Sequence, residues 1–148
     1  MGITVEDRLD IAELLALHGH LCDDGELDRF DEVFAADVVY DLSEFGRPDL
    51  VGPAALAAAG RALGDGNPVG HHVTNIVLTE AADGTVHARS KGIGVMADGS
   101  CGSVTYDDTM VRGEAGWRIS RRRVTAHRRP LGQKAGQGMA GHSPEGSG

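Results

Sequence analysis

The chain has 148 residues, of which 41% are apolar and 24% are charged, as expected for one globular domain with a real hydrophobic core. Its 22 acidic residues outnumber its 14 Lys and Arg residues and give a net charge of −8, which argues against a nucleic-acid partner because phosphates attract a basic surface. Two cysteines, no signal-peptide pattern and no long apolar run together indicate a cytoplasmic protein without a membrane segment.

The first half of the chain is predicted to be mainly helical. Apolar side chains recur at helical spacing after Thr4, which can cap the first helix together with Asp7 three residues on. Pro53 suits the first turn of a later, alanine-rich helix. We expect helices over residues 5–22, 27–34 and 54–63, and a short β-branched strand over residues 37–42.

The second half of the chain is predicted to be a meander of strands. Asp-Gly pairs at 83–84 and 98–99 separate alternating runs and are strong hairpin signals. Helices first and antiparallel strands after them are typical of an α+β domain, and a strongly curved sheet over the helices would leave a cavity. The expected strands cover residues 71–80, 85–96, 100–112 and 117–127.

The end of the chain has a different composition. From residue 133 to residue 148 the only large apolar side chain is Met139, so this stretch cannot offset the entropy of ordering it. The sequence therefore predicts one domain over residues 1–132 and a disordered tail over residues 133–148.

Three segments and the order of the elements carry a family resemblance. The segments DDGELDRFDEVFAADVVYD, GHHVTNIVL and YDDTMVRGEAGWRI resemble the SnoaL-like branch of the NTF2-like superfamily, over about residues 5–130. That branch includes scytalone dehydratase, a hexachlorocyclohexane dehydrochlorinase and a bile-acid dehydratase. The resemblance implies a cone of three N-terminal helices on a strongly curved, mixed but mostly antiparallel sheet that encloses a pocket. It also implies a homodimer or homotrimer.

The resemblance implies a catalytic pair. Catalytic members share an Asp at the end of the first helix and a His at the start of the first meander strand, and these align with Asp23 and His71. A slip of one residue would replace them with Asp24 or His72. A histidine can accept a proton at neutral pH, and a carboxylate on one ring nitrogen fixes the tautomer and stabilises the imidazolium.

Other side chains are candidates for substrate binding. The dehydratases carry two tyrosines at positions that align here with Cys22 and Leu42, and Tyr40 could substitute from the same face of its strand. Arg123 and His127 share the parity of Trp117 along the last strand, so either could contact an anionic leaving group if that face turns inward. The candidate substrate-binding residues are Tyr40, Tyr106, His18, Asn75 and Asp108.

The sequence gives no motif for a metal or a cofactor. His18 and His20 are two residues apart on a helix and diverge by roughly 200°, so they cannot chelate one metal ion. No two histidines lie at helical i,i+4 spacing, and there is no closely spaced Cys pair, no Gly-rich phosphate loop and no G-x-S-x-G. We therefore expect neither a metal nor a cofactor.

Three functions follow from these observations. The first is a cofactor-independent lyase or isomerase, dehydratase- or cyclase-like, in which Asp23 and His71 abstract a proton from a small hydrophobic cyclic or polyketide-like compound. The second is a non-catalytic protein that binds a small molecule or serves in assembly, because the fold hosts both kinds of function. The third is an enzyme like ketosteroid isomerase, with Asp41 or Asp108 as a carboxylate base.

Overall fold

The computed structural model of the chain describes residues 2–133, so all but the first residue of the predicted tail lies outside the described residues. None of the helices in this range has both the length and the apolar character that crossing a membrane requires. The elements are α1 (Val5–Asp23), η1 (Leu27–Glu32), β1 (Phe34–Asp41), η2 (Ser43–Phe45), β2 (Leu50–Val51), α2 (Pro53–Leu63), η3 (Gly64–Gly66), β3 (Gly70–Glu80), β4 (Val86–Val95), β5 (Cys101–Gly113), β6 (Gly116–His127) and η4 (Pro130–Gly132).

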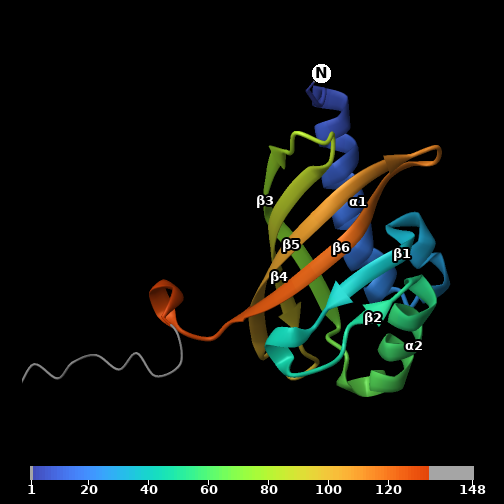
Figure 1. Cartoon of the computed structure of the whole chain (residues 1–148). Coiled ribbons are helices and arrows are strands. Elements are labelled where there is room, and N and C mark those ends of the chain that lie inside the picture. Colours follow the sequence, from blue (N-terminus) through green and yellow to red (C-terminus); the bar gives the residue numbers. More distant parts are fainter. Residues whose placement is uncertain (1, 134–148) are drawn as a thin grey trace, which may run out of the picture.

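The strands form one curved sheet with helices on it, which confirms the predicted α+β class. Its six strands run in the order β2-β1-β6-β5-β4-β3. The β1–β6 pair is parallel and the other pairs are antiparallel, so the sheet is mixed but mostly antiparallel. Figure 1 shows α1 running along one face of the long strands, while α2 lies beside β1 and β2.

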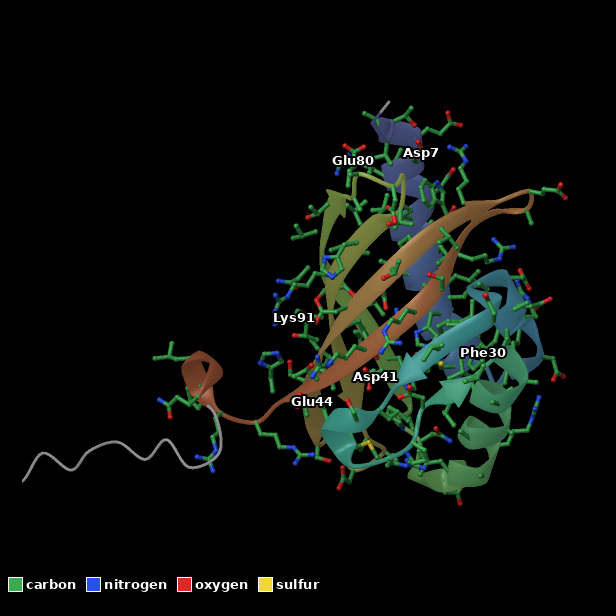
Figure 2. The ribbon with its side chains drawn as sticks, in the orientation of Figure 1. Asp7, Phe30, Asp41, Glu44, Glu80 and Lys91 are labelled. Atoms are coloured by element: carbon green, nitrogen blue, oxygen red, sulfur yellow. The ribbon has the colours of Figure 1, made fainter. Side chains whose placement is uncertain are left out.

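The start of α1 is fixed as the sequence predicted. Thr4 and Asp7 form a complete capping box, with the Asp7 backbone N–H donating to Thr4 Oγ1 over 3.0 Å. Asp7 also accepts hydrogen bonds from Trp117 Nε1 and Arg112, which tie the helix to the far hairpin. The backbone N–H of Ile3 donates to Glu80, and Figure 2 shows Asp7 and Glu80 at the same end of the molecule.

The core lies mainly between α1 and the sheet, with contributions from η1 and α2. α1 presents a stripe of buried residues at helical spacing, and alternate residues of the strands meet it. The aromatic side chains are few, so the packing depends mainly on aliphatic groups. The buried cluster consists of Ile11, Leu15, Leu21, Phe30, Val33, Phe34, Val38, Leu56, Ala57, Val86, Ala88, Met110, Trp117 and Ile119.

Two local predictions were wrong in detail. The second helix is a 3-10 turn over Leu27–Glu32 rather than an α-helix to residue 34, and the first strand starts at Phe34 rather than at residue 37. The reason is tertiary pairing, since Phe34 lies in register with Ile119 of β6. The two-residue strand β2 was not predicted, because it is too short to show alternation.

The hairpin turns follow the local chemistry of their residues. Gly84 and Gly99 have φ values of 83° and 85°, a region that glycine adopts without a steric penalty. In each turn the preceding aspartate accepts the backbone N–H of the residue after the glycine, as at Asp98 and Ser100. Both predicted Asp-Gly hairpins are therefore present, between β3 and β4 and between β4 and β5.

Candidate active site

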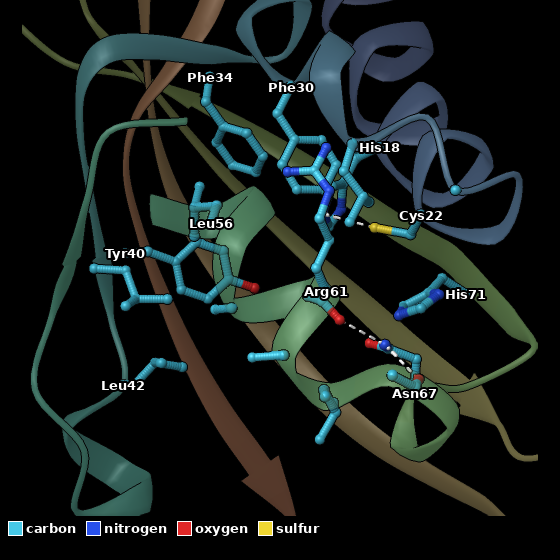
Figure 3. A pocket seen from close by; sticks show the side chains of 18 of the residues that line it. His18, Cys22, Phe30, Phe34, Tyr40, Leu42, Leu56, Arg61, Asn67 and His71 are labelled. Atoms are coloured by element: carbon cyan, nitrogen blue, oxygen red, sulfur yellow. Dashed lines mark hydrogen bonds between the residues drawn. The ribbon is translucent and has the colours of Figure 1, made fainter. Parts of the chain in front are cut away.

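A cavity of about 620 Å³ opens between the C-terminal end of α1, the helix α2 and the sheet. Figure 3 shows it from close by, with aromatic and aliphatic side chains on one side and His71 and Asn67 on the other. Most of its wall is apolar, and the polar groups are few. The lining includes His18, Cys22, Leu27, Phe30, Phe34, Tyr40, Leu42, Arg47, Leu50, Leu56, Arg61, Leu63, Asn67, His71 and Tyr106.

The structure brings Asp23 and His71 together at the edge of this cavity. Asp23 is the last residue of α1 and His71 is the second residue of β3. The Nδ1 atom of His71 lies 2.7 Å from Asp23 Oδ1, and the His71 backbone N–H donates to both carboxylate oxygens at 3.0 Å. Their side chains are 21% and 26% exposed, so solvent reaches the pair only in part.

The hydrogen bonds of this pair define the tautomer of His71. An ionised carboxylate only accepts hydrogen bonds, so the Nδ1 atom that faces Asp23 carries the proton. The Nε2 lone pair is then left available as a base, and the carboxylate would stabilise the imidazolium that forms. Of the alternatives that a slip would bring in, Asp24 is the exposed C-cap of α1 and His72 is not part of the cavity lining.

Two tyrosines and two phenylalanines give the cavity an aromatic wall. Tyr40 comes from β1 and Tyr106 from β5, and both belong to the lining. Phe34 makes edge-to-face contacts with Tyr40 and Phe30, with ring centroids 6.2 and 5.7 Å apart. Burial raises the pKa of Tyr40 and of Tyr106, which keeps both phenols protonated and therefore able to donate hydrogen bonds.

The positions of the two missing tyrosines also face the cavity. Cys22 and Leu42 both line it, which agrees with their alignment to the tyrosines of the dehydratases. Tyr40 lies two residues before Leu42 and lines the same cavity, as its parity predicted. At the two positions where the dehydratases have tyrosines, this site thus has the thiol of Cys22 and the apolar side chain of Leu42, while the phenol of Tyr40 lines the cavity from a neighbouring position.

Asn75 and Asp108, which we expected to contact substrate, do not line the cavity. Asn75 has a φ of 56° at a β-bulge between Thr74 and Val77, and its Oδ1 accepts from Thr74 Oγ1 at 2.6 Å. Asp108 is fully buried and forms a two-pronged ion pair with Arg122, with both N···O distances at 2.7 Å. Each has a local structural partner instead.

Arg122 is the important residue that the sequence analysis missed. Arg123 shares the parity of Trp117 and would point inward if the strand alternated regularly, but in the structure Arg122 is fully buried and Arg123 is exposed and paired with Glu44. A bulge explains the shift: Met110 pairs with Ile119 whereas Thr109 pairs with Arg121, so β6 carries one extra residue between them. His127, at the end of the same strand, bonds Thr105 and does not line the cavity. Alternation alone gives no signal for such a bulge.

Within residues 2–133, no three His, Cys, Asp or Glu side chains gather closely enough to hold a metal ion. The chemistry that this part of the chain offers is a partly enclosed imidazole base and neutral hydrogen-bond donors on an apolar wall. Such a set suits the removal of a proton from carbon and the stabilisation of an oxygen that gains charge.

Several solved structures share this fold. An NTF2-like protein with a cystatin-like fold from Novosphingobium aromaticivorans is 31% identical, with a TM-score of 0.69 over 88% of this chain and 86% of that chain. A protein proposed to be an aromatic ring hydroxylase, from the same organism, is 29% identical, with a TM-score of 0.70 over 84% and 92%. The protein Aln2 from a Streptomyces species is 26% identical, with a TM-score of 0.69 over 85% and 94%.

Sequence comparison gives the family. None of the curated proteins matches the chain. The profile of the SnoaL-like domain, however, matches residues 4–123, which is most of the described chain and includes both Asp23 and His71. On this match, and on the NTF2-like fold just described, the chain belongs to the SnoaL-like domain family.

Proposed function

We propose that the protein is a cofactor-independent lyase or isomerase that removes a proton from a carbon atom of a small hydrophobic cyclic or polyketide-like substrate. The observation that carries the proposal is the 2.7 Å contact between His71 Nδ1 and Asp23 Oδ1 at the edge of a largely apolar cavity. A family member that served only as a scaffold would have no need to hold an imidazole in one tautomer beside such a cavity.

The proposed reaction starts at His71 Nε2. This atom takes the proton from carbon, and Asp23 stabilises the imidazolium through the hydrogen bond to Nδ1. The electron pair of the broken C–H bond then forms a C=C bond. In an elimination the hydroxyl of the neighbouring carbon leaves with the electrons of its C–O bond, takes the proton back from His71 Nε2 and departs as water, whereas in an isomerisation His71 returns that proton to another carbon. The phenols of Tyr40 and Tyr106 are protonated donors for the oxygen involved.

The cavity supports the substrate class. Its volume of about 620 Å³ lies within the usual range of small-molecule sites, roughly 300–1,000 Å³. Phe30, Phe34 and Tyr40 contribute aromatic side chains to its wall, which suits a flat, cyclic compound. The similar protein that is proposed to be an aromatic ring hydroxylase is likewise named for a cyclic aromatic compound.

A carboxylate base like that of ketosteroid isomerase has less support. Asp41 accepts the backbone N–H of Ser43 and pairs with Arg121, while Asp108 is paired with Arg122 beneath the cavity. Neither carboxylate belongs to the cavity lining. Both carboxylates are already engaged by arginine side chains, so neither is placed to take a proton from a molecule bound in the cavity.

The test uses a panel of aromatic polyketides, hydroxylated steroids and halogenated cycloalkanes. Ligands that raise the melting temperature are incubated with the wild type, Asp23→Asn and His71→Ala, and the products are followed by mass spectrometry in D₂O. We expect conversion or deuterium uptake by the wild type, and a loss of about 10²–10⁴-fold in His71→Ala. Arg123→Ala, an exposed change outside the cavity, is the matched control and keeps wild-type turnover.

The same experiment separates catalysis from binding alone. If ligands stabilise all the variants equally and the wild type neither converts them nor exchanges deuterium, the cavity is a binding site without chemistry and the proposal is wrong.

A further inference from the structure

His18 is a buried histidine that the proposed proton abstraction does not use. It projects from α1 into the wall of the cavity, and the residue is only 6% exposed. Its ring is held by aromatic neighbours on several sides, with centroids 5.3 Å from Phe34, 5.8 Å from Phe30 and 6.4 Å from Tyr106. A ring packed in this way has one orientation, so its two nitrogens have fixed partners.

One of these partners is a guanidinium that cannot turn away. Arg122 Nη1 lies 3.1 Å from His18 Nδ1. The remaining edge of the guanidinium, Nε and Nη2, binds both oxygens of Asp108, and the Arg122 Cζ atom stacks 4.0 Å from the centre of the Tyr106 ring. The side chains of Arg122 and Asp108 are both fully buried.

This contact fixes the tautomer of His18. Arginine stays protonated in proteins and can only donate, so His18 Nδ1 must accept and carries no proton. The proton of the neutral ring is then on Nε2. Burial, followed by the positive charge of Arg122, lowers the pKa of His18 well below its usual value, so the ring stays neutral.

The Nε2–H group of His18 donates to a weak hydrogen-bond acceptor in this structure. Its hydrogen-bond neighbour is the Sγ atom of Cys22, 3.5 Å away, and a thiol sulfur is a weak acceptor. Cys22 itself lines the cavity, and Figure 3 shows the two side chains joined at the end of α1. An oxygen atom of a bound molecule would be a better acceptor than this sulfur.

We propose that His18 is a neutral hydrogen-bond donor which binds an oxygen atom of the substrate through Nε2–H, with Arg122 as the positioning residue that fixes the tautomer. The two histidines of the cavity would then have opposite roles. Asp23 accepts a hydrogen bond from Nδ1–H of His71 and so leaves Nε2 of that ring free to act as a base, whereas Arg122 donates a hydrogen bond to Nδ1 of His18 and so leaves the proton of that ring on Nε2, which becomes a donor.

The chemical role is electrostatic and transfers no proton. When His71 removes a proton next to a carbonyl carbon, negative charge moves onto the carbonyl oxygen. A donor that is already oriented toward that oxygen stabilises the charge more than the neutral ketone. The inference rests on the proposed function only in taking this cavity as the substrate site, and its test requires no turnover.

The first measurement is ¹⁵N NMR of the imidazole rings in the wild-type protein, with His18 assigned by comparison with His18→Gln. Arg122, Cys22, Tyr106 and His71 are the titratable or charged groups around the ring. Between about pH 6 and pH 8 we expect Nδ1 of His18 to resonate as an unprotonated nitrogen and Nε2 as a protonated one. The opposite tautomer, or a charged ring, overturns the proposal.

The second measurement compares two probes that differ by one oxygen, 1-tetralone and tetralin. The two probes share the same hydrocarbon frame, so the ratio of their dissociation constants isolates the contribution of the carbonyl oxygen to the affinity. In the wild type we expect tetralone to shift the His18 Nε2 resonance, and in His18→Leu we expect the preference for tetralone to fall by about threefold to tenfold. His18→Gln, which offers an amide N–H near the same place, should restore part of the preference.

Asp23→Asn separates this inference from the proposed function. Its tetralone preference should equal that of the wild type even though its turnover is lost. If tetralone does not bind, or binds without moving the Nε2 resonance, or keeps its preference in His18→Leu, then His18 is not the donor, whatever the outcome for Asp23 and His71.

Discussion

Cys22 shows how a single side chain sets the polarity of this cavity. It stands where the dehydratases that the chain resembles have a tyrosine, next to Asp23 in sequence and in contact with His18. Burial, and then the negative charge of Asp23, raises the pKa of its thiol to about 11. A neutral thiol in place of a phenol leaves more room in the cavity and removes a strong donor, so the oxygen of a ligand has to find its donors elsewhere.

The raised pKa predicts a slow reaction of Cys22 with alkylating agents. The thiolate is the nucleophile, and an increase from 9.0 to about 11 lowers its fraction near pH 8 by about 100-fold. Cys101 is exposed, so the reagent reaches its thiol freely and we expect it to react much faster than Cys22. The check is the rate of iodoacetamide labelling in two single-cysteine proteins, Cys101→Ser and Cys22→Ser. Equal rates in the two would contradict the burial of the Cys22 thiol.

At the scale of elements, the candidate pair depends on how closely α1 approaches β3. Gly19 faces the start of β3, and a Cβ atom there would lie 2.6 Å from the backbone oxygen of His71. Glycine therefore allows the helix to lie against the strand, which places Asp23, one turn further along α1, opposite the backbone N–H and ring of His71. The geometry of the pair is thus a property of helix packing as well as of two side chains.

Gly19→Ala should therefore disturb the pair although it introduces only a methyl group. In an open helical position alanine is more stable than glycine by about 1 kcal/mol. Here the methyl group meets backbone, so we expect a loss of about 1–3 kcal/mol in the free energy of unfolding and a change in the His71 ring resonances. Urea unfolding and NMR test this.

Ala16→Gly is the control for Gly19→Ala, because Ala16 is an exposed residue of the same helix. It should lower the stability by about 1 kcal/mol and leave the His71 signals in place. A stabilised Gly19→Ala protein with unchanged His71 signals would show that the close approach does not matter.

The limits of prediction from the sequence also appear at this scale. The Thr4–Asp7 cap and the Asp-Gly turns depend on neighbours in the chain, and the structure confirms them. The place of Arg122 depends on an extra residue in β6, which the pairing with β5 and β1 accommodates and which local pattern does not reveal. The chain positions of Asp23 and His71 came from the family resemblance rather than from periodicity, since helical or strand spacing cannot indicate a contact 48 residues apart.

At the scale of the whole molecule, one buried ion pair links the sheet to the helix and the cavity. Asp108 of β5 and Arg122 of β6 are cross-strand partners, and both are fully buried. Through His18 the pair also reaches α1. A buried pair is not a strong source of stability compared with apolar packing, but one member left alone is costly. We therefore regard it as an arrangement that specifies the site rather than as a stabilising device.

Asp108→Ala should lower the free energy of unfolding by about 3–5 kcal/mol, because it leaves the Arg122 charge buried without a partner. Glu44→Ala removes the partner of Arg123 at the surface, where the side chains are 51% and 41% exposed, and should cost about 0–1 kcal/mol. Chemical denaturation of the two variants measures the difference. Similar losses in both would mean that Arg122 finds water or another acceptor when Asp108 is removed.

The buried His18 also predicts how the stability of the whole domain depends on pH. Burial and the charge of Arg122 lower its pKa in the folded protein well below 6.5, so below that pH the unfolded chain binds a proton here that the folded chain does not. The contribution of His18 is thus intact above about pH 6.5 and is lost as the pH falls, by about 1.4 kcal/mol per pH unit for one proton.

Unfolding by urea at about pH 7.5, 6.5 and 5.5 tests this dependence on His18. Hydrogen bonds from Thr4 and Ser43 lower the pKa values of Asp7 and Asp41. Their contribution to the free energy of unfolding is therefore lost in a separate, more acidic range, below their usual pKa of 3.8. Between pH 6.5 and pH 5.5, the free energy of unfolding of His18→Leu should therefore depend on pH less steeply than that of the wild type, by about one proton. His20→Leu changes an exposed position of the same helix and should keep the wild-type slope. Parallel slopes for the wild type and His18→Leu would mean that His18 takes up its proton while the protein is folded, and a protonated ring could not accept the hydrogen bond from Arg122 that fixes its tautomer.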